Sequence, residues 1–327
     1  METTLFKNNT FKKNIILNTP MTSKNIIQSI IYIIGNEYHF TELDKHELSY
    51  NFNKLIFIKD INTRTLNQLN KTSNILVLFN KNDMISKDLK LALETKNINY
   101  MKIQEFTKIY LFKCYMSKKE ENTTLVENIK NYSLLHKTIK FLIDYIAVII
   151  LSILSSPFIL YSIYRIKKES PGPILFKQKR VGLNGKEFEC IKLRSMNLDA
   201  EKNGAQFATE NDARIFAWGK TMRSTRIDEL PQLWNIIKGD MHLIGPRPER
   251  KVWINQFEKE IPHYNKRHNV KPGVTGWAQV LYPYGADTED AKQKLMYDLY
   301  YIKHWSLWLE LKTVWKTIMV VLMKKGV

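Results

Sequence analysis

Glycine and proline are nearly absent from the first half of this 327-residue chain. Of the 12 glycines only Gly35 precedes Gly172, and of the 10 prolines only Pro20 precedes Pro157. A loop that cradles phosphate groups needs glycine, because its backbone must approach the ligand closely. A nucleotide-binding loop is therefore disfavoured in the first half, and motifs that carry chemistry are expected in the second.

Cysteine is equally scarce. Only Cys114 and Cys190 occur, far apart and without the spacing of a zinc site or a disulfide framework. The segment from Met1 to Pro20 is polar and rich in Asn and Lys, so it lacks the apolar core of a signal peptide. Both absences predict a protein that works in a reduced, cytosolic setting.

Acidic residues are outnumbered. The chain has 50 Lys and Arg against 32 Asp and Glu, a formal net charge of +18. This excess predicts an anionic partner, which can be nucleic acid, acidic lipid headgroups or a phosphorylated substrate.

The N-terminal part, residues 1–133, alternates short apolar runs with helix-like segments such as Ser86–Thr95. The runs typical of strands are Ile30–Ile34, Leu55–Ile58 and Ile75–Phe79. The alternation predicts a small α/β accessory domain with an open, Rossmann-like parallel sheet. The polar stretch Ser117–Asn131 marks the boundary to a second domain over residues 134–327.

One uncharged run, Tyr145 to Tyr164, is long enough for a membrane, since 20 residues of helix reach about 30 Å. Pro157 in mid-run removes a backbone donor, and Ser156 can satisfy a carbonyl that the proline leaves free. Positive residues flank the run on both sides: Lys137, Lys140, Arg165, Lys167 and Lys168. Both ends are therefore expected in the cytoplasm, which predicts a re-entrant helix over residues 141–166, broken at Ser156–Pro157. A single spanning helix and a buried core helix are the alternatives.

Residues 303–325 place apolar side chains at helical spacing with lysines between them. Trp305, Trp308 and Trp315 favour an amphipathic helix at the membrane interface. A helix that packs on the domain core has the same pattern, and the pattern alone does not decide.

A basic segment follows the apolar run. Gly182 and Gly185 suit a turn between two short strands. Four basic residues around this turn are candidate phosphate or substrate contacts: Lys179, Arg180, Lys192 and Arg194. A solvated basic hairpin has the same composition, so this segment by itself is weak support.

Two adjacent carboxylates, Asp228 and Glu229, lie among arginines, with Arg223 and Arg226 just before them. Adjacent side chains diverge, so the two are predicted to have different roles: one attacks phosphorus, and the other holds a metal that neutralises a diphosphate. The structural alternative is a helix capping box formed by Thr225 and Asp228.

Arg247 lies between Pro246 and Pro248 in a Gly-Pro-Arg-Pro-Glu sequence. The prolines stiffen the backbone, which suits a guanidinium that clamps a phosphate with two bonds.

The order of these motifs resembles the bacterial sugar transferase family, the monotopic polyprenyl-phosphate sugar-1-phosphate transferases, over about Lys137 to Val327. The matching segments are Ser156–Pro157, Lys179–Gly182, Asp228–Gln232, Gly245–Pro248, Lys271–Gln279 and Tyr297–Tyr301. The resemblance implies an α+β membrane-associated catalytic domain in which Asp228 is the nucleophile and Glu229 a Mg²⁺ ligand. It implies phosphate or substrate contacts by Arg223, Arg226, Arg247 and Gln279. His242 stands where relatives usually have serine.

The implied reaction moves a sugar-1-phosphate from a nucleotide sugar, by family habit a UDP-sugar, to polyprenyl (undecaprenyl) phosphate. It releases a nucleoside monophosphate and initiates surface polysaccharide or glycan assembly. The expected location is the cytoplasmic membrane, with an anionic bilayer as partner and no nucleic acid; a homodimer stays open.

Three alternatives are an inactive membrane scaffold, a membrane-tethered nucleic-acid-binding protein and a retaining glycosyltransferase. The intact Asp228–Glu229 pair argues against the scaffold. Basic residues that gather around carboxylates, rather than forming a stripe with aromatics, argue against nucleic acid. A retaining glycosyltransferase would release a nucleoside diphosphate instead.

Overall fold

The computed structural model describes residues 30–34, 40–58, 75–79, 86–116, 133–202, 204, 206, 212–283, 285 and 287–323. The chain forms two compact units, Met1–Glu121 and Asn122–Val327. The predicted boundary segment, Ser117–Asn131, lies outside the described residues.

The N-terminal unit contains the predicted parallel sheet. Its strands, in the order β2-β1-β3-β4 and all paired in parallel, are β1 (Ile30–Ile34), β2 (Lys54–Ile58), β3 (Ile75–Phe79) and β4 (Asn99–Lys102). β3 is buried along its whole length, as expected of a central strand covered on both faces. The helical elements are α2 (Glu42–Ser49), α4 (Lys87–Thr95), α5 (Ile103–Phe106) and the π-helix η4 (Thr107–Leu111). Ser86 caps α4 through its hydroxyl, which confirms the helix predicted there.

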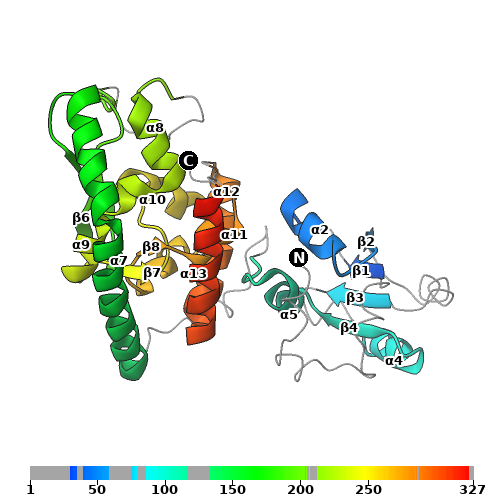
Figure 1. Ribbon diagram of the computed structural model, residues 1–327. Helices are drawn as coiled ribbons and strands as arrows, with labels where there is room; N and C mark the ends of the chain where they lie inside the picture. Colours follow the sequence, from blue (N-terminus) through cyan, green and yellow to red (C-terminus); the bar gives the residue numbers. More distant parts are fainter. Residues whose placement is uncertain are drawn as a thin grey trace. The chain divides into compact units, whose positions relative to one another are not determined.

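The C-terminal unit is built along α7 (Leu134–Glu169), a helix of 36 residues that Figure 1 shows as one continuous ribbon. By length and composition it is the one helix of the described residues that could cross a membrane. The predicted break at Ser156–Pro157 is wrong, because the helix continues through Pro157. The Ser156 hydroxyl donates to the carbonyl of Ile153 at 2.8 Å. That carbonyl is the acceptor the missing N–H of Pro157 would have used, so the serine replaces the lost bond.

One face of α7 is bound to the rest of its unit near both ends. The contacts are Lys140 with Glu310 at 2.8 Å, Asp144 with His242 at 2.5 Å, and Glu169 with the backbone N–H of Trp218 at 2.6 Å. The opposite face is apolar and exposed, with Ile153 at 68% and Leu160 at 67% of full exposure. The helix therefore presents an apolar surface to its surroundings, while Lys140, Asp144 and Glu169 face protein.

An antiparallel hairpin follows, as predicted from the basic segment: β5 (Leu175–Val181), the turn η5 (Leu183–Gly185) and β6 (Glu187–Leu193). β7 (His242–Ile244) and β8 (Gly273–Thr275) form a short parallel pair. The remaining elements are α8 (Ala217–Thr225), η6 (Ile227–Glu229), α9 (Gln232–Ile237), α10 (Lys251–Glu260), η7 (Tyr264–Asn269), α11 (Trp277–Leu281), α12 (Thr288–Lys303) and α13 (Leu307–Leu322).

The helix predicted over 303–325 is α13, and it is shorter than predicted. Lys303 ends α12, and the Ser306 hydroxyl caps α13 by accepting from the N–H of Leu309 at 3.2 Å. Leu309, Glu310 and Thr313 are buried. The exposed apolar side chains of α13 are Leu307, Trp308, Leu311, Trp315, Ile318 and Leu322. The helix packs on its unit through one face, as the core-packing interpretation expects, and its other face is exposed; its place at a membrane interface stays a prediction.

Candidate active site

The two carboxylates lie on the short turn η6. α8 ends at Thr225, and the next residue, Arg226, has a φ of 61°, which reverses the chain direction. Asp228 and Glu229 are each 5% exposed. The alternative capping box does not form, because the Thr225 hydroxyl donates to a carbonyl of its own helix at 2.7 Å. The backbone turn therefore places both carboxylates inside the unit.

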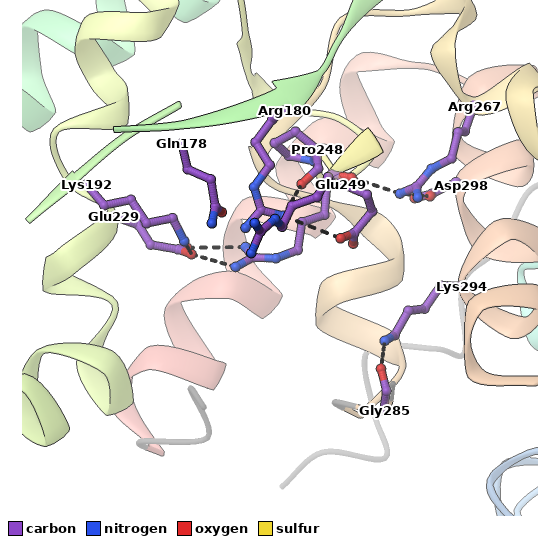
Figure 2. Close-up of polar contacts among 12 residues, drawn as sticks. Gln178, Arg180, Lys192, Glu229, Pro248, Glu249, Arg267, Gly285, Lys294 and Asp298 are labelled. Atoms are coloured by element: carbon purple, nitrogen blue, oxygen red, sulfur yellow. Dashed lines mark hydrogen bonds and ion pairs between the residues drawn. The ribbon is translucent and has the colours of Figure 1, made fainter. Parts of the chain in front are cut away.

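Glu229 is surrounded by cations from three separate segments. Lys192 of β6 contacts its Oε1 at 2.8 Å, Arg247 contacts the same oxygen at 2.7 Å, and Arg226 contacts Oε2 at 3.4 Å. Figure 2 shows Lys192 and Glu229 joined in this way. Burial would raise the pKa of Glu229, but the charges of Arg247, Lys192 and Arg226 outweigh it and hold that pKa well below its ordinary value.

Asp228 is held differently from its neighbour. Its Oδ1 is buried and accepts no hydrogen bond. Burial raises the pKa of Asp228 to about 6, although the charges of Lys192, Arg223 and Arg226 act in the opposite direction. Two adjacent carboxyl groups with pKa values shifted apart are typical of a site in which each group has its own role.

Arg247 is fixed by its neighbours in space. Arg180 of β5 donates to the carbonyl of Pro248 at 3.1 Å. Arg267 of η7 donates to the carbonyl of Arg247 itself at 2.9 Å. Figure 2 shows Arg180 beside Pro248 and Glu249, in the region of Lys192 and Glu229.

The structure thus brings Lys192, Arg226 and Arg247 together with the carboxylate pair, and Arg223 acts on it through charge. Other predicted residues have other surroundings. Arg194 donates to the carbonyl of Pro173 and the hydroxyl of Ser170, both at 2.6 Å, just beyond the end of α7.

Lys179 and Gln279 complete the set of predicted contacts. Lys179 is exposed on β5, opposite Glu189. Gln279 donates weakly to the carbonyl of Val274 at 3.4 Å, and its buried Oε1 accepts no hydrogen bond. Neither side chain is hydrogen-bonded to the carboxylates, so their predicted role in substrate binding stays a prediction.

Sequence reasoning missed two buried residues that shape the site. Arg267 is one of them. Asn235 of α9 is the other: it accepts from the N–H of Ile191 at 3.0 Å and donates to the carbonyl of Glu189 at 2.6 Å. These bonds fix β6, which carries Lys192, to the helix that follows the carboxylates. An amide in the otherwise apolar stretch Leu233–Ile237 was the available signal.

The carboxylate pair can take part in metal binding only together with other donors. Within the described ranges, no three His, Cys, Asp or Glu side chains are grouped to hold a metal ion. Asp228 offers one free oxygen, and Glu229 Oε2 has only contacts at 3.4 Å, to Arg226 and Arg247. Mg²⁺ is usually bound by one or two carboxylates with substrate phosphates and water. The residues therefore fit a Mg²⁺ ion that a diphosphate helps to hold.

Known proteins match the same part of the chain. The UDP-N-acetylgalactosamine-undecaprenyl-phosphate N-acetylgalactosaminephosphotransferase of Aeromonas hydrophila is 50% identical over 179 residues, 55% of this chain and 42% of that protein. The UDP-glucose:undecaprenyl-phosphate glucose-1-phosphate transferase of Xanthomonas campestris pv. campestris is 45% identical over 163 residues, 49% of this chain and 34% of that protein. Its namesake from Caulobacter vibrioides is 40% identical over 181 residues, 55% of this chain and 68% of that protein.

The chain spans less than half the length of the first two relatives. Residues 135–324, more than half of the chain, match the family described as bacterial sugar transferase. The carboxylate pair, its cations and all of α7 except its first residue, Leu134, lie within these residues. The predicted resemblance is confirmed: this chain belongs to the bacterial sugar transferase family.

Proposed function

We propose that the chain transfers a sugar-1-phosphate from a UDP-sugar to undecaprenyl phosphate, through a covalent intermediate on Asp228. The observation that carries this proposal is the buried carboxylate oxygen of Asp228, which accepts no hydrogen bond beside a carboxylate bound by three cations. The relatives' names describe undecaprenyl-phosphate acceptors and UDP-sugar donors, which agree with it.

Two displacements at one phosphorus make up the reaction. An oxygen of Asp228 attacks the phosphorus that bears the sugar, the bond from that phosphorus to the bridging oxygen breaks, and UMP leaves with the electron pair. An oxygen of undecaprenyl phosphate then attacks the same phosphorus and releases the carboxylate. Division into two steps lets the soluble donor and the lipid acceptor use the site in turn.

The cations around Glu229 supply the charge that the donor needs. Glu229 holds the side chains of Arg247 and Lys192 in place by ion pairs. Because two positive charges contact one carboxylate, the excess positive charge is available to bind the diphosphate of the donor. Asp228 and Glu229 would hold Mg²⁺ together with phosphate oxygens, and the ion would neutralise charge on the diphosphate. Glu229 thus orients cations in addition to the ligand role expected of it.

We also propose that both ends of α7 lie on the cytoplasmic side of the membrane. Lys140 near its start and Glu169 at its end are both bound to the unit that carries the carboxylates. A spanning helix would carry one end and its polar partners through the hydrocarbon core, where such groups are costly. With Cys114 replaced by serine, cysteines at Leu135 and Lys168 should both resist labelling from outside the cell; labelling of either contradicts this topology.

The product, undecaprenyl diphosphate carrying one sugar, is an unextended lipid-linked starter. Its chemistry supports a role at the first membrane step of polysaccharide or glycan assembly, at the cytoplasmic membrane.

Incubation of the full chain with labelled UDP-N-acetylgalactosamine or UDP-glucose, Mg²⁺ and no lipid tests the proposal. UMP should appear in a burst equal to the enzyme present, while sugar label stays on the protein. Added undecaprenyl phosphate should then remove the label from the protein. The Asp228→Asn variant should show neither burst nor label. Release of UDP instead of UMP would identify a glycosyltransferase, and UMP release only when lipid is present would rule out the covalent intermediate.

A further inference from the structure

Four consecutive backbone carbonyls around Arg247 each accept one hydrogen bond. The donors are Gly273 N–H to Pro246 at 2.9 Å, Arg267 Nη2 to Arg247 at 2.9 Å, Arg180 Nη1 to Pro248 at 3.1 Å, and Val181 N–H to Glu249 at 2.9 Å. Pro246 and Pro248 have no N–H, so carbonyls are the main groups through which this segment can be held. The carbonyls of Arg247 and Pro248 both accept from arginine side chains.

Arg180 is placed to hold backbone rather than to reach outward. Its side chain is 17% exposed, and its Nη1 also lies 3.5 Å from the Glu249 carboxylate. Burial lowers the pKa of Arg180; Glu249 acts against this, while the charges of Arg247 and Arg250 add to it. A buried cation near other cations is costly unless acceptors compensate for it. For Arg180 these acceptors are the Pro248 carbonyl and the Glu249 carboxylate.

Arg267 is fixed even more firmly. It is 5% exposed. One guanidinium nitrogen donates to the Tyr264 hydroxyl at 2.6 Å, and another lies 2.8 Å from the Asp298 carboxylate of α12. The guanidinium plane is therefore set by η7 and α12, and its bond to the Arg247 carbonyl transmits that position to the segment.

We infer that Arg180 and Arg267 are positioning residues, which hold Arg247 through its own carbonyl and that of the next residue, Pro248. The inference rests on the proposed function in one respect, that Arg247 contacts the donor diphosphate. It revises the expectation that Arg180 itself binds phosphate. A guanidinium must be held closely to bind two oxygens at once, and displacement of about 1 Å can cost about a hundredfold in rate.

Hydrogen–deuterium exchange on the full chain in detergent micelles tests the positioning without any substrate. Arg180→Met should speed exchange at the amides of Arg247 and Glu249 at least tenfold. The matched control, Arg194→Met, removes another buried arginine that binds carbonyls, those near Ser170, and should leave both amides unchanged. Arg267→Lys, which keeps a charge near Asp298, should also speed exchange. Unchanged exchange in both Arg180→Met and Arg267→Lys would overturn the inference.

A double-mutant cycle with UDP-N-acetylgalactosamine and undecaprenyl phosphate then separates positioning from direct phosphate contact. Arg180→Met should lower kcat/KM by about tenfold to a hundredfold in the native chain. In an Arg247→Met background it should lower kcat/KM less than twofold, because the group it positions is gone. The salt dependence of KM should match that of the native chain. If the losses in kcat/KM from the two substitutions multiply in the double variant, and KM of Arg180→Met depends less on salt, Arg180 is instead a phosphate ligand. A native chain with no turnover on any UDP-sugar would refute the proposed function, and the exchange data would still decide the positioning.

Discussion

Two groups of buried charges in the C-terminal unit are built in opposite ways. Along α7, the Lys140 ammonium faces the Glu310 carboxylate, so that each of these two buried charges has one main partner. At η6, Glu229 alone is bound by Lys192, Arg226 and Arg247. In the first arrangement each positive charge is matched by one negative charge, whereas in the second the positive charges outnumber the carboxylate that they contact.

The difference separates packing from function. A buried charge is costly unless it is paired, and a one-to-one pair meets that need with nothing further to bind. The cations around Glu229 are only half-buried, and positive charge in excess of the carboxylate can attract an anionic ligand. The ratio of positive to negative charges in each cluster therefore indicates which charges stabilise the fold and which bind a substrate.

Removal of the nucleophile should give the largest effect. Asp228→Asn keeps the size and burial of the side chain but cannot form an acyl phosphate, so turnover should fall by at least about a thousandfold. UMP release with undecaprenyl phosphate and a UDP-sugar measures it. The exposed Asp199→Asn is the matched control and should retain full activity. A residual activity of a few per cent or more in Asp228→Asn would assign the attack to another group.

The balanced pairs should control folding rather than chemistry. Lys140→Met leaves the Glu310 carboxylate buried with only the neutral donors Tyr301 and Trp305, and should destabilise the chain by about 3 to 5 kcal/mol. Unfolding in detergent micelles measures the loss. Lys137→Met, on the exposed side of the same helix, should change stability by less than about 0.5 kcal/mol. Equal effects of the two substitutions would show that the pair contributes nothing.

Part of the fold and of the site could be predicted from sequence, whereas the pairing of buried charges could not, and the reasons are physical. Three strands of the parallel sheet and the basic hairpin follow from local pattern and turn residues, and the structure confirms them. The structure also places the adjacent carboxylates among cations, while their chemical roles stay predictions. Pro157 was wrongly expected to break α7, because the outcome depends on whether the Ser156 hydroxyl reaches Ile153. The burial of Arg267 comes from Asp298 on a distant helix. Such long-range pairing leaves no periodic signal.

The activity should also depend on pH in the direction set by Asp228. Only the ionised carboxylate can attack, and its pKa is about 6 because of burial. We expect kcat/KM to fall about tenfold per pH unit below that value and to level off above it. Burial also raises the pKa of Asp298 to about 6, so the same profile should be measured in Asp298→Asn. A profile that loses its acid limb in that variant would assign the titration to Asp298 instead.

The smallest expected effect is on the stability of the fold. At pH 7, replacing an aspartate by asparagine should stabilise the chain at the surplus-charge site and destabilise it at a one-to-one ion pair. The pKa of Asp228 is raised from 3.8 to about 6, so the folded state binds this proton more tightly than the unfolded chain does. Stability is therefore lost as pH rises from about 4 to about 6, by up to about 3 kcal/mol for a shift of roughly two units. Asp228→Asn carries no charge, and should be more stable than the native chain at pH 7 but not at pH 4.

Asp44 of α2 is the matched case from a balanced pair, since its carboxylate contacts buried Lys113 at 2.6 Å. Asp44→Asn should destabilise the chain at pH 7, because a buried cation loses the charge that faces it. Unfolding midpoints of both variants and the native chain at pH 4 and pH 7 provide the comparison. A destabilised Asp228→Asn at pH 7 would mean that Asp228 is held by its cations as firmly as Asp44 is, and charge balance would no longer distinguish the site from the scaffold. A stabilised one would show that the fold gives up stability to keep an unbonded carboxylate ready for attack.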